Sequence, residues 1–136
     1  MGLDNGIRME AKTSRGIKYL TENHDFYFDK DDNEIGYWRK CRNIRNEVLN
    51  TFADKDYDGM GGYISLTSVK DLVTMAETLK YFLPEAHWDE GESIWEWHIV
   101  LPSTANAIKK LRCLINDVEN GVVSIDDLDI YFYDSY

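Results

Sequence analysis

Residues 2–12 read GLDNGIRMEAK, and in this stretch apolar and charged side chains take turns. The apolar positions are Ile7, Met9 and Ala11, and the charged positions between them are Arg8, Glu10 and Lys12. A period of two places alternate side chains on opposite faces of a strand. The stretch therefore predicts a β-strand with one buried face, near the start of the chain.

Two further strands are predicted, one at the end of the chain and one in its second half. The C-terminal stretch DLDIYFYDSY, residues 127–136, is rich in aromatic side chains and β-prone, and we expect it to complete the sheet. Its aromatic side chains could stack on bases or sugars, but at alternating spacing we interpret them as core residues. IWEWHIVL, residues 94–101, alternates tryptophan and aliphatic residues with Glu96 and His98, which predicts a strand buried mainly on its tryptophan side.

Three other stretches have the period of a helix. The first runs from about Tyr37 to Phe52. The second covers residues 69–83, with Ser65 as its expected N-cap and Pro84 as its stop. The third begins at Pro102 and ends before Gly121. We therefore predict one α+β domain over residues 1–136, with about three helices packed on a small, mainly antiparallel sheet that includes both chain termini.

Composition limits the classes of function. The chain has 136 residues, 43% of them hydrophobic, which is enough for a core without metals or disulfides. Its formal charge of -10 argues against nucleic-acid binding, which needs a basic surface. We interpret the charge first as a solvated acidic surface that favours solubility, with a basic protein partner as the alternative. The sequence shows no membrane span or signal peptide, and the cysteines Cys41 and Cys113 fit reduced core residues. These features predict a cytoplasmic protein.

The stretch DKDYDGMGGYIS, residues 54–65, is similar to a calcium-binding EF-hand loop. Asp54, Asp56 and Asp58 occupy positions 1, 3 and 5 of such a loop, and Gly59 occupies the turn position. The twelfth position, which should supply a bidentate carboxylate, is Ser65. We therefore interpret the stretch as a polar turn between helices, with weak calcium binding as an alternative, and expect no cofactor.

One longer stretch, EIGYWRKCRNIRNEV at residues 34–48, resembles a group of small bacteriophage and prophage proteins. Their other shared features are an MGLD start, matched by residues 1–4, and a short aromatic tail, matched by YFYDSY at 131–136. The region between Pro84 and Pro102 departs from the family pattern. The resemblance implies a phage or prophage setting and supplies no catalytic residue.

The same motif contains a candidate polar site. Arg39 offers a planar guanidinium that can bind a carboxylate in two places, and Asp4 or Glu34 is a plausible partner. One interpretation is a structural salt bridge beneath the N-terminal strand. The other is a polar pocket formed by Asp4, Glu34, Arg39 and His98.

Three functions stay open at this point. The first is a non-enzymatic phage or prophage accessory protein that binds a host or phage protein. The second is a small hydrolase or ligand-binding protein that uses the pocket at Asp4, Glu34 and Arg39. The third is a weak calcium-binding protein. A concave pocket at those three residues would favour the second, and a flat acidic surface would favour the first.

Overall fold

The computed structural model describes residues 4–28, 33–39, 42–53, 55, 63–82 and 94–135, and for residues 39, 42, 94–101 and 135 it describes the backbone alone. Its sheet has four strands in the order β2-β1-β4-β3. The two central strands are β1 (Asp4–Ala11) and β4 (Leu128–Ser135), which pair antiparallel from Asp4↔Ser135 to Ala11↔Leu128. β2 (Glu34–Arg39) pairs antiparallel with β1, and β3 (Tyr63–Ser65) pairs antiparallel with β4.

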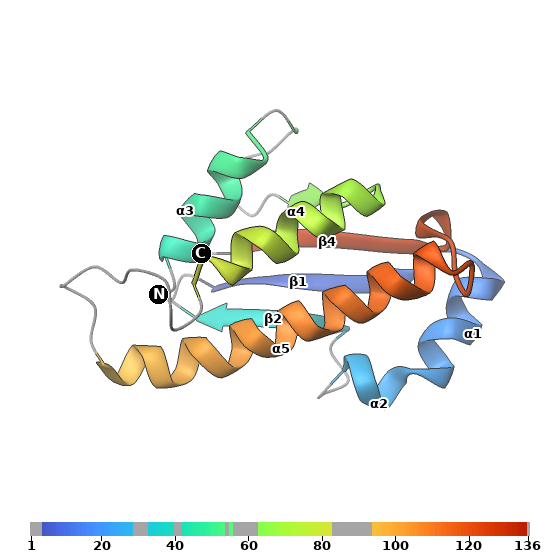
Figure 1. Ribbon diagram of the computed structural model, residues 1–136, viewed down its shortest axis with the longest axis horizontal. Coiled ribbons are helices and arrows are strands. Elements are labelled where there is room, and N and C mark those ends of the chain that lie inside the picture. The colour runs from blue at the N-terminus through green and yellow to red at the C-terminus, as the bar shows by residue number, and fades with distance from the viewer. Residues whose placement is uncertain are drawn as a thin grey trace.

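The helical elements are α1 (Ser14–Glu22), α2 (His24–Tyr27), α3 (Arg42–Thr51), α4 (Val69–Lys80), α5 (Ile94–Glu119) and the 3-10 turn η1 (Ile125–Asp127). The α+β class and the antiparallel sheet with both terminal strands are thus confirmed. Figure 1 shows α4 and α5 lying across the same face of the sheet. We call this the inner face. Within the described residues, no helix combines the length and the apolar character that crossing a bilayer requires.

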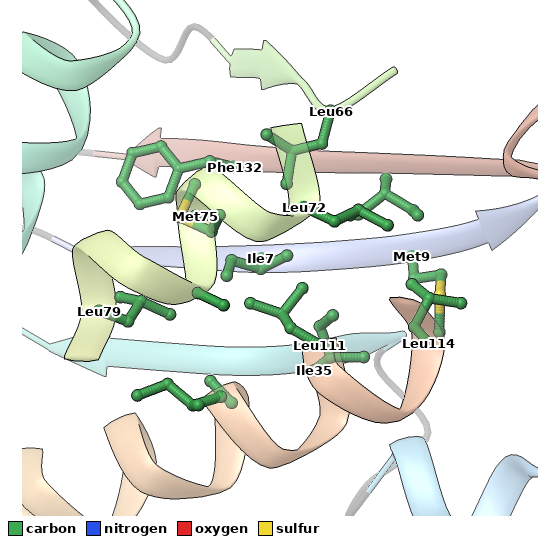
Figure 2. Packing of buried hydrophobic residues seen from close by; sticks show 14 of the residues in the cluster. Ile7, Met9, Ile35, Leu66, Leu72, Met75, Leu79, Leu111, Leu114 and Phe132 are labelled. Carbon is green, nitrogen blue, oxygen red and sulfur yellow. The ribbon is translucent and has the colours of Figure 1, made fainter. Parts of the chain in front are cut away.

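The inner face holds the hydrophobic core. Figure 2 shows Ile7 and Met9 of β1 beneath side chains of α4 and α5, with Phe132 of β4 beside them. The helices contribute buried leucines at the expected helical spacing, namely Leu72 and Leu79 from α4 and Leu111 and Leu114 from α5. Burying apolar area of this kind is the main favourable term in folding. It fixes which face of each strand points inward.

Two helix ends show how local sequence sets the boundaries. Ser68, and not Ser65, caps α4: its hydroxyl accepts a hydrogen bond from the Asp71 backbone N–H at 3.1 Å. The prediction that Ser65 caps this helix was wrong, because Ser65 lies in the strand β3, before the helix begins. The predicted stop at Gly121 is confirmed, because this residue has φ +75° just after α5.

One predicted element was wrong in type, and a predicted helix was placed to begin too early. Residues 94–101 are helical, the first turns of α5, and Pro102 lies inside that helix instead of starting it. Ile94, Trp97 and Leu101 are also three and four residues apart, so the sequence fits both periods. Tyr37 and Trp38 belong to β2, where Trp38 is buried and Tyr37 exposed, and the helix begins at Arg42.

Candidate functional site

The strand register brings polar and tyrosine side chains together on the sheet face opposite α4 and α5. Arg8 of β1 lies between Glu34 of β2 and Tyr131 of β4, and Tyr133 of β4 lies opposite Tyr63 of β3. Directly opposed residues of antiparallel strands project to the same side. Because Ile7 and Met9 point inward, these neighbours point outward, and we call this side the outer face.

The outer face contains a pocket of about 420 Å³. It is lined by Asp4, Arg8, Glu34, Tyr37, Tyr63, Tyr131, Tyr133 and Asp134. The tyrosine rings at its rim are open to solvent, with Tyr37 42% exposed and Tyr63 59% exposed. Exposed tyrosines around a hollow offer a ligand both apolar ring surface and hydroxyl groups.

A polar cluster forms the floor of this pocket. The Tyr133 hydroxyl donates a hydrogen bond to Glu34 Oε1 at 2.6 Å, across the intervening strand β1. The Arg8 guanidinium lies 4.4 Å from the centre of the Tyr133 ring, and its Nη2 is 3.3 Å from the same Glu34 oxygen. Burial, and then the hydrogen bond to Glu34, raise the pKa of Tyr133 above its ordinary value of 10.0, so this hydroxyl remains a donor at neutral pH.

Gly6 makes the crossing of Tyr133 possible. A Cβ at this position would lie 2.8 Å from Cε1 of the Tyr133 ring and 2.6 Å from the Gly36 carbonyl oxygen. Both distances are shorter than van der Waals contact. The glycine therefore leaves the space in which the Tyr133 ring lies across β1 and reaches Glu34.

Two further acidic residues line the pocket, and their side chains differ in their surroundings. Asp134 is fully buried and accepts a hydrogen bond from Nε of Arg45 on α3. Asp4 is half-buried, and its Oδ1 accepts no hydrogen bond within the described part of the chain. An acceptor in this state has unused capacity for a donor.

Of the four pocket residues predicted from the sequence, two line the observed pocket, and the side chains of the other two lie outside the described residues. Asp4 and Glu34 line the same pocket, and Glu34 is bound by Arg8 and Tyr133. The backbone of Arg39 lies opposite Asp4 in the register, but its side chain is outside the described residues. His98 lies in α5 and not in a strand, and its side chain is outside the described residues too. The roles of these residues remain predictions.

The predicted calcium ligands Asp54, Asp56 and Asp58 also lie outside the described residues. Across the described ranges, no group of three or more histidine, cysteine or acidic side chains is arranged to hold a metal ion. Of the cysteines, Cys113 is free and half-buried, while Cys41 lies outside the described residues.

Sequence reasoning missed the tyrosines and Arg8. The aromatic tail was interpreted as core, and this is right for Phe132, which is fully buried, but not for its neighbours Tyr131 and Tyr133. The signal was present, since Arg8 and both tyrosines occupy the outward phase of their strands. The register that places them side by side is a long-range property, which the periodicity of each strand does not contain.

A second tyrosine cluster lies where α1 and α2 contact α5. The Tyr19 hydroxyl donates to Asp117 Oδ2 at 2.6 Å and lies 2.5 Å from the Tyr27 hydroxyl. Burial is the main cause that raises the pKa of both tyrosines. These contacts join α1 and α2 to α5, and we interpret the cluster as structural.

Comparison with protein-family models, with curated proteins and with solved structures gives no significant match.

Proposed function

We propose that the chain is a non-enzymatic binding protein that contacts another protein through its outer face. One observation carries this proposal: a pocket of about 420 Å³ lined by four tyrosines, two of them exposed to solvent, on the face opposite the core helices. Tyrosine is enriched at protein interfaces because it buries a large area and loses little conformational entropy. A sheet also holds such rings in fixed positions, which reduces the cost of binding.

The class of partner follows from charge and from the resemblance. A formal charge of -10 disfavours nucleic acid and favours a protein with a basic surface. The resemblance of residues 34–48 to small phage and prophage proteins supports an accessory role, with a host or phage protein as the partner. We place this role in the cytoplasm, where both cysteines would stay reduced.

A second candidate, a small-ligand site or hydrolase, is favoured by the concave shape of the pocket. Its volume falls within the range of small-molecule sites. Asp4 and Glu34 line it, as the sequence-based hypothesis requires. Glu34, however, already accepts hydrogen bonds from Arg8 and Tyr133 on its Oε1, so this oxygen is engaged in contacts within the protein. The geometry therefore fits binding better than hydrolysis.

The test is affinity capture with a matched control. The immobilised protein is exposed to a lysate of the phage-infected host, and captured proteins are identified by mass spectrometry. Tyr63→Ala removes an exposed ring from the outer face, and Tyr81→Ala removes a ring of similar exposure, 56%, that follows α4.

We expect a partner whose capture falls with Tyr63→Ala and is unchanged with Tyr81→Ala. Capture that both variants reduce equally, or that neither reduces, would contradict a contact through the outer face. Turnover of a small ester or amide by the wild-type protein, lost with Glu34→Gln, would favour the second candidate instead.

A further inference from the structure

We propose that the outer-face pocket receives an arginine side chain of the partner protein, held between tyrosine rings and the carboxylate of Asp4. This inference depends on the proposed function and names the chemistry that the site would recognise. Three features of the pocket support it: a guanidinium already bound there, a pair of tyrosine rings beside it, and an excess of carboxylates.

The pocket already binds one guanidinium in this manner. Arg8 stacks 4.4 Å from the Tyr133 ring centre while its nitrogens lie within 3.4 Å of a Glu34 oxygen. A planar cation on an aromatic face with a carboxylate at its edge is a favourable arrangement for arginine. The chain thus shows, with its own residue, that the floor of the pocket suits a guanidinium.

A similar set of groups stands next to Arg8. The rings of Tyr63 and Tyr131 lie 5.5 Å apart at 59°, and Tyr63 is directly opposite Tyr133 in the register. Tyr63 is 59% exposed, so its ring is accessible to a second molecule. These rings can provide the aromatic surface, as Tyr133 does for Arg8.

The charges around the pocket favour a cation. Its described lining residues include the acidic residues Asp4, Glu34 and Asp134 and one cation, Arg8. The Asp134 side chain is fully buried on the inward phase of β4, so Asp4 and Glu34 are the carboxylates on the outer face. Glu34 is bound by Arg8, and Asp134 is bound by Arg45 from α3. Asp4 is half-buried, and its Oδ1, which is shielded from solvent, accepts no hydrogen bond from the described residues. A guanidinium entering the pocket can donate to this carboxylate, and the overall charge of -10 would attract it.

Arginine fits these groups better than lysine. Its planar fork donates to a carboxylate and stacks on a ring at the same time, whereas the lysine ammonium is a compact and strongly hydrated point charge. A partner that presents an exposed arginine on a loop or a strand end would therefore be selected over one that presents lysine.

The test uses a defined peptide and measures its affinity by calorimetric titration at low ionic strength. The probe is the capped pentapeptide Gly-Gly-Arg-Gly-Gly, and the comparison peptide has citrulline, the neutral isostere, in place of arginine. We expect the arginine peptide to bind about tenfold more tightly than the citrulline peptide.

Paired variants separate the pocket from general attraction to an acidic protein. Asp4→Asn should weaken the arginine peptide about threefold, and Asp126→Asn, the same charge change on exposed η1, should leave it within about 1.5-fold. Tyr63→Leu should also lower the affinity for the arginine peptide about threefold, whereas Tyr63→Phe, which keeps the ring, should retain the wild-type affinity. A melting curve of each variant confirms that it is folded.

Equal affinity for the arginine and citrulline peptides would overturn the inference, and so would equal effects of Asp4→Asn and Asp126→Asn. These results would leave the proposed function standing if capture of a partner still depended on Tyr63. Loss of that dependence would remove the proposed function as well, so the two failures can be told apart.

Discussion

Replacing Gly6 by alanine tests whether the Tyr133 side chain, which lies across β1 over Gly6 and binds Glu34, contributes to the stability of the outer face. The added Cβ would lie 2.6 Å from the Gly36 carbonyl oxygen and 2.8 Å from the Tyr133 ring. The carbonyl belongs to strand β2 and cannot move without disturbing the pairing of β1 with β2. The ring can rotate away, but it then loses its hydrogen bond to Glu34.

The magnitude follows from these two contacts. Overpacking of this kind costs about 1–3 kcal/mol, and the loss of a hydrogen bond to a charged group adds about 1.5 kcal/mol or more. The alanine recovers about 0.4–1 kcal/mol, because it restricts the unfolded chain. We expect a net loss of about 2–3 kcal/mol. For a chain of 136 residues this lowers the melting temperature by about 7–10 °C.

The assay is thermal unfolding followed by circular dichroism, together with a spectrophotometric titration of tyrosine at alkaline pH. Tyr133 should titrate late in the wild type, because its pKa is raised, and earlier in Gly6→Ala. Gly121→Ala is the matched control: its φ of +75° costs an alanine about 1 kcal/mol, but no atom lies within 4 Å of the added Cβ. A fall of less than about 2 °C for Gly6→Ala, with the tyrosine titration unchanged, would refute the reasoning.

Three other predictions concern stability and calcium. Arg45→Ala should lower the free energy of unfolding in urea by about 3–5 kcal/mol, because its partner Asp134 is fully buried. Arg15→Ala should lower it by less than about 1 kcal/mol, because the Arg15 side chain is 54% exposed, and equal losses would contradict this. Asp127 accepts hydrogen bonds from the hydroxyl of Thr13, the N-cap of α1, and from the Ser124 backbone N–H, and these bonds lower its pKa below the ordinary value of 3.8. The contribution of this carboxylate to folding stability is therefore present above pH 3.8 and is lost as the pH falls through the lower pKa of the folded state. Melting temperatures between pH 6 and pH 2 should therefore fall less steeply in Asp127→Asn, and parallel curves would show that the carboxylate is not involved. Calcium at about 1 mM should shift the melting temperature by less than about one degree, and a larger rise that Asp54→Ala abolishes would reveal a working site.

The sequence predicted the parts of the fold that depend on local periodicity. The alternation of Ile7 and Met9 located β1, and the aromatic tail located β4, since in each strand one phase is buried against the helices. The stripes of α4 and the later part of α5 were equally clear, with Leu72 and Leu111 fully buried.

Where two periods fitted the same residues, the prediction failed. IWEWHIVL is apolar at nearly every position, so its pattern could not distinguish a strand from the start of α5. The short helices α1 and α2 were not predicted, because they have only nine and four residues, which leaves few turns in which a helical period can be recognised.

The candidate site was predicted in part. Asp4 and Glu34 were named from a motif, and both line the pocket. Its tyrosines come from three strands whose order, β2-β1-β4-β3, follows from long-range pairing that no local pattern contains. Gly6 could not be linked to Tyr133 for the same reason, since they are adjacent only once β1 and β4 have paired.

The central claim, that the outer-face pocket is a binding site for an arginine side chain, is tested most directly by mapping the bound peptide on the protein. Two-dimensional amide NMR spectra are recorded while the arginine pentapeptide is added to the 15N-labelled protein. We predict that the largest shifts fall on pocket residues of β1, β3 and β4, centred on Asp4, Tyr63 and Tyr133, and that the citrulline peptide leaves these signals in place. Shifts spread over the acidic surface, or centred on η1 and the end of α5, would contradict the account.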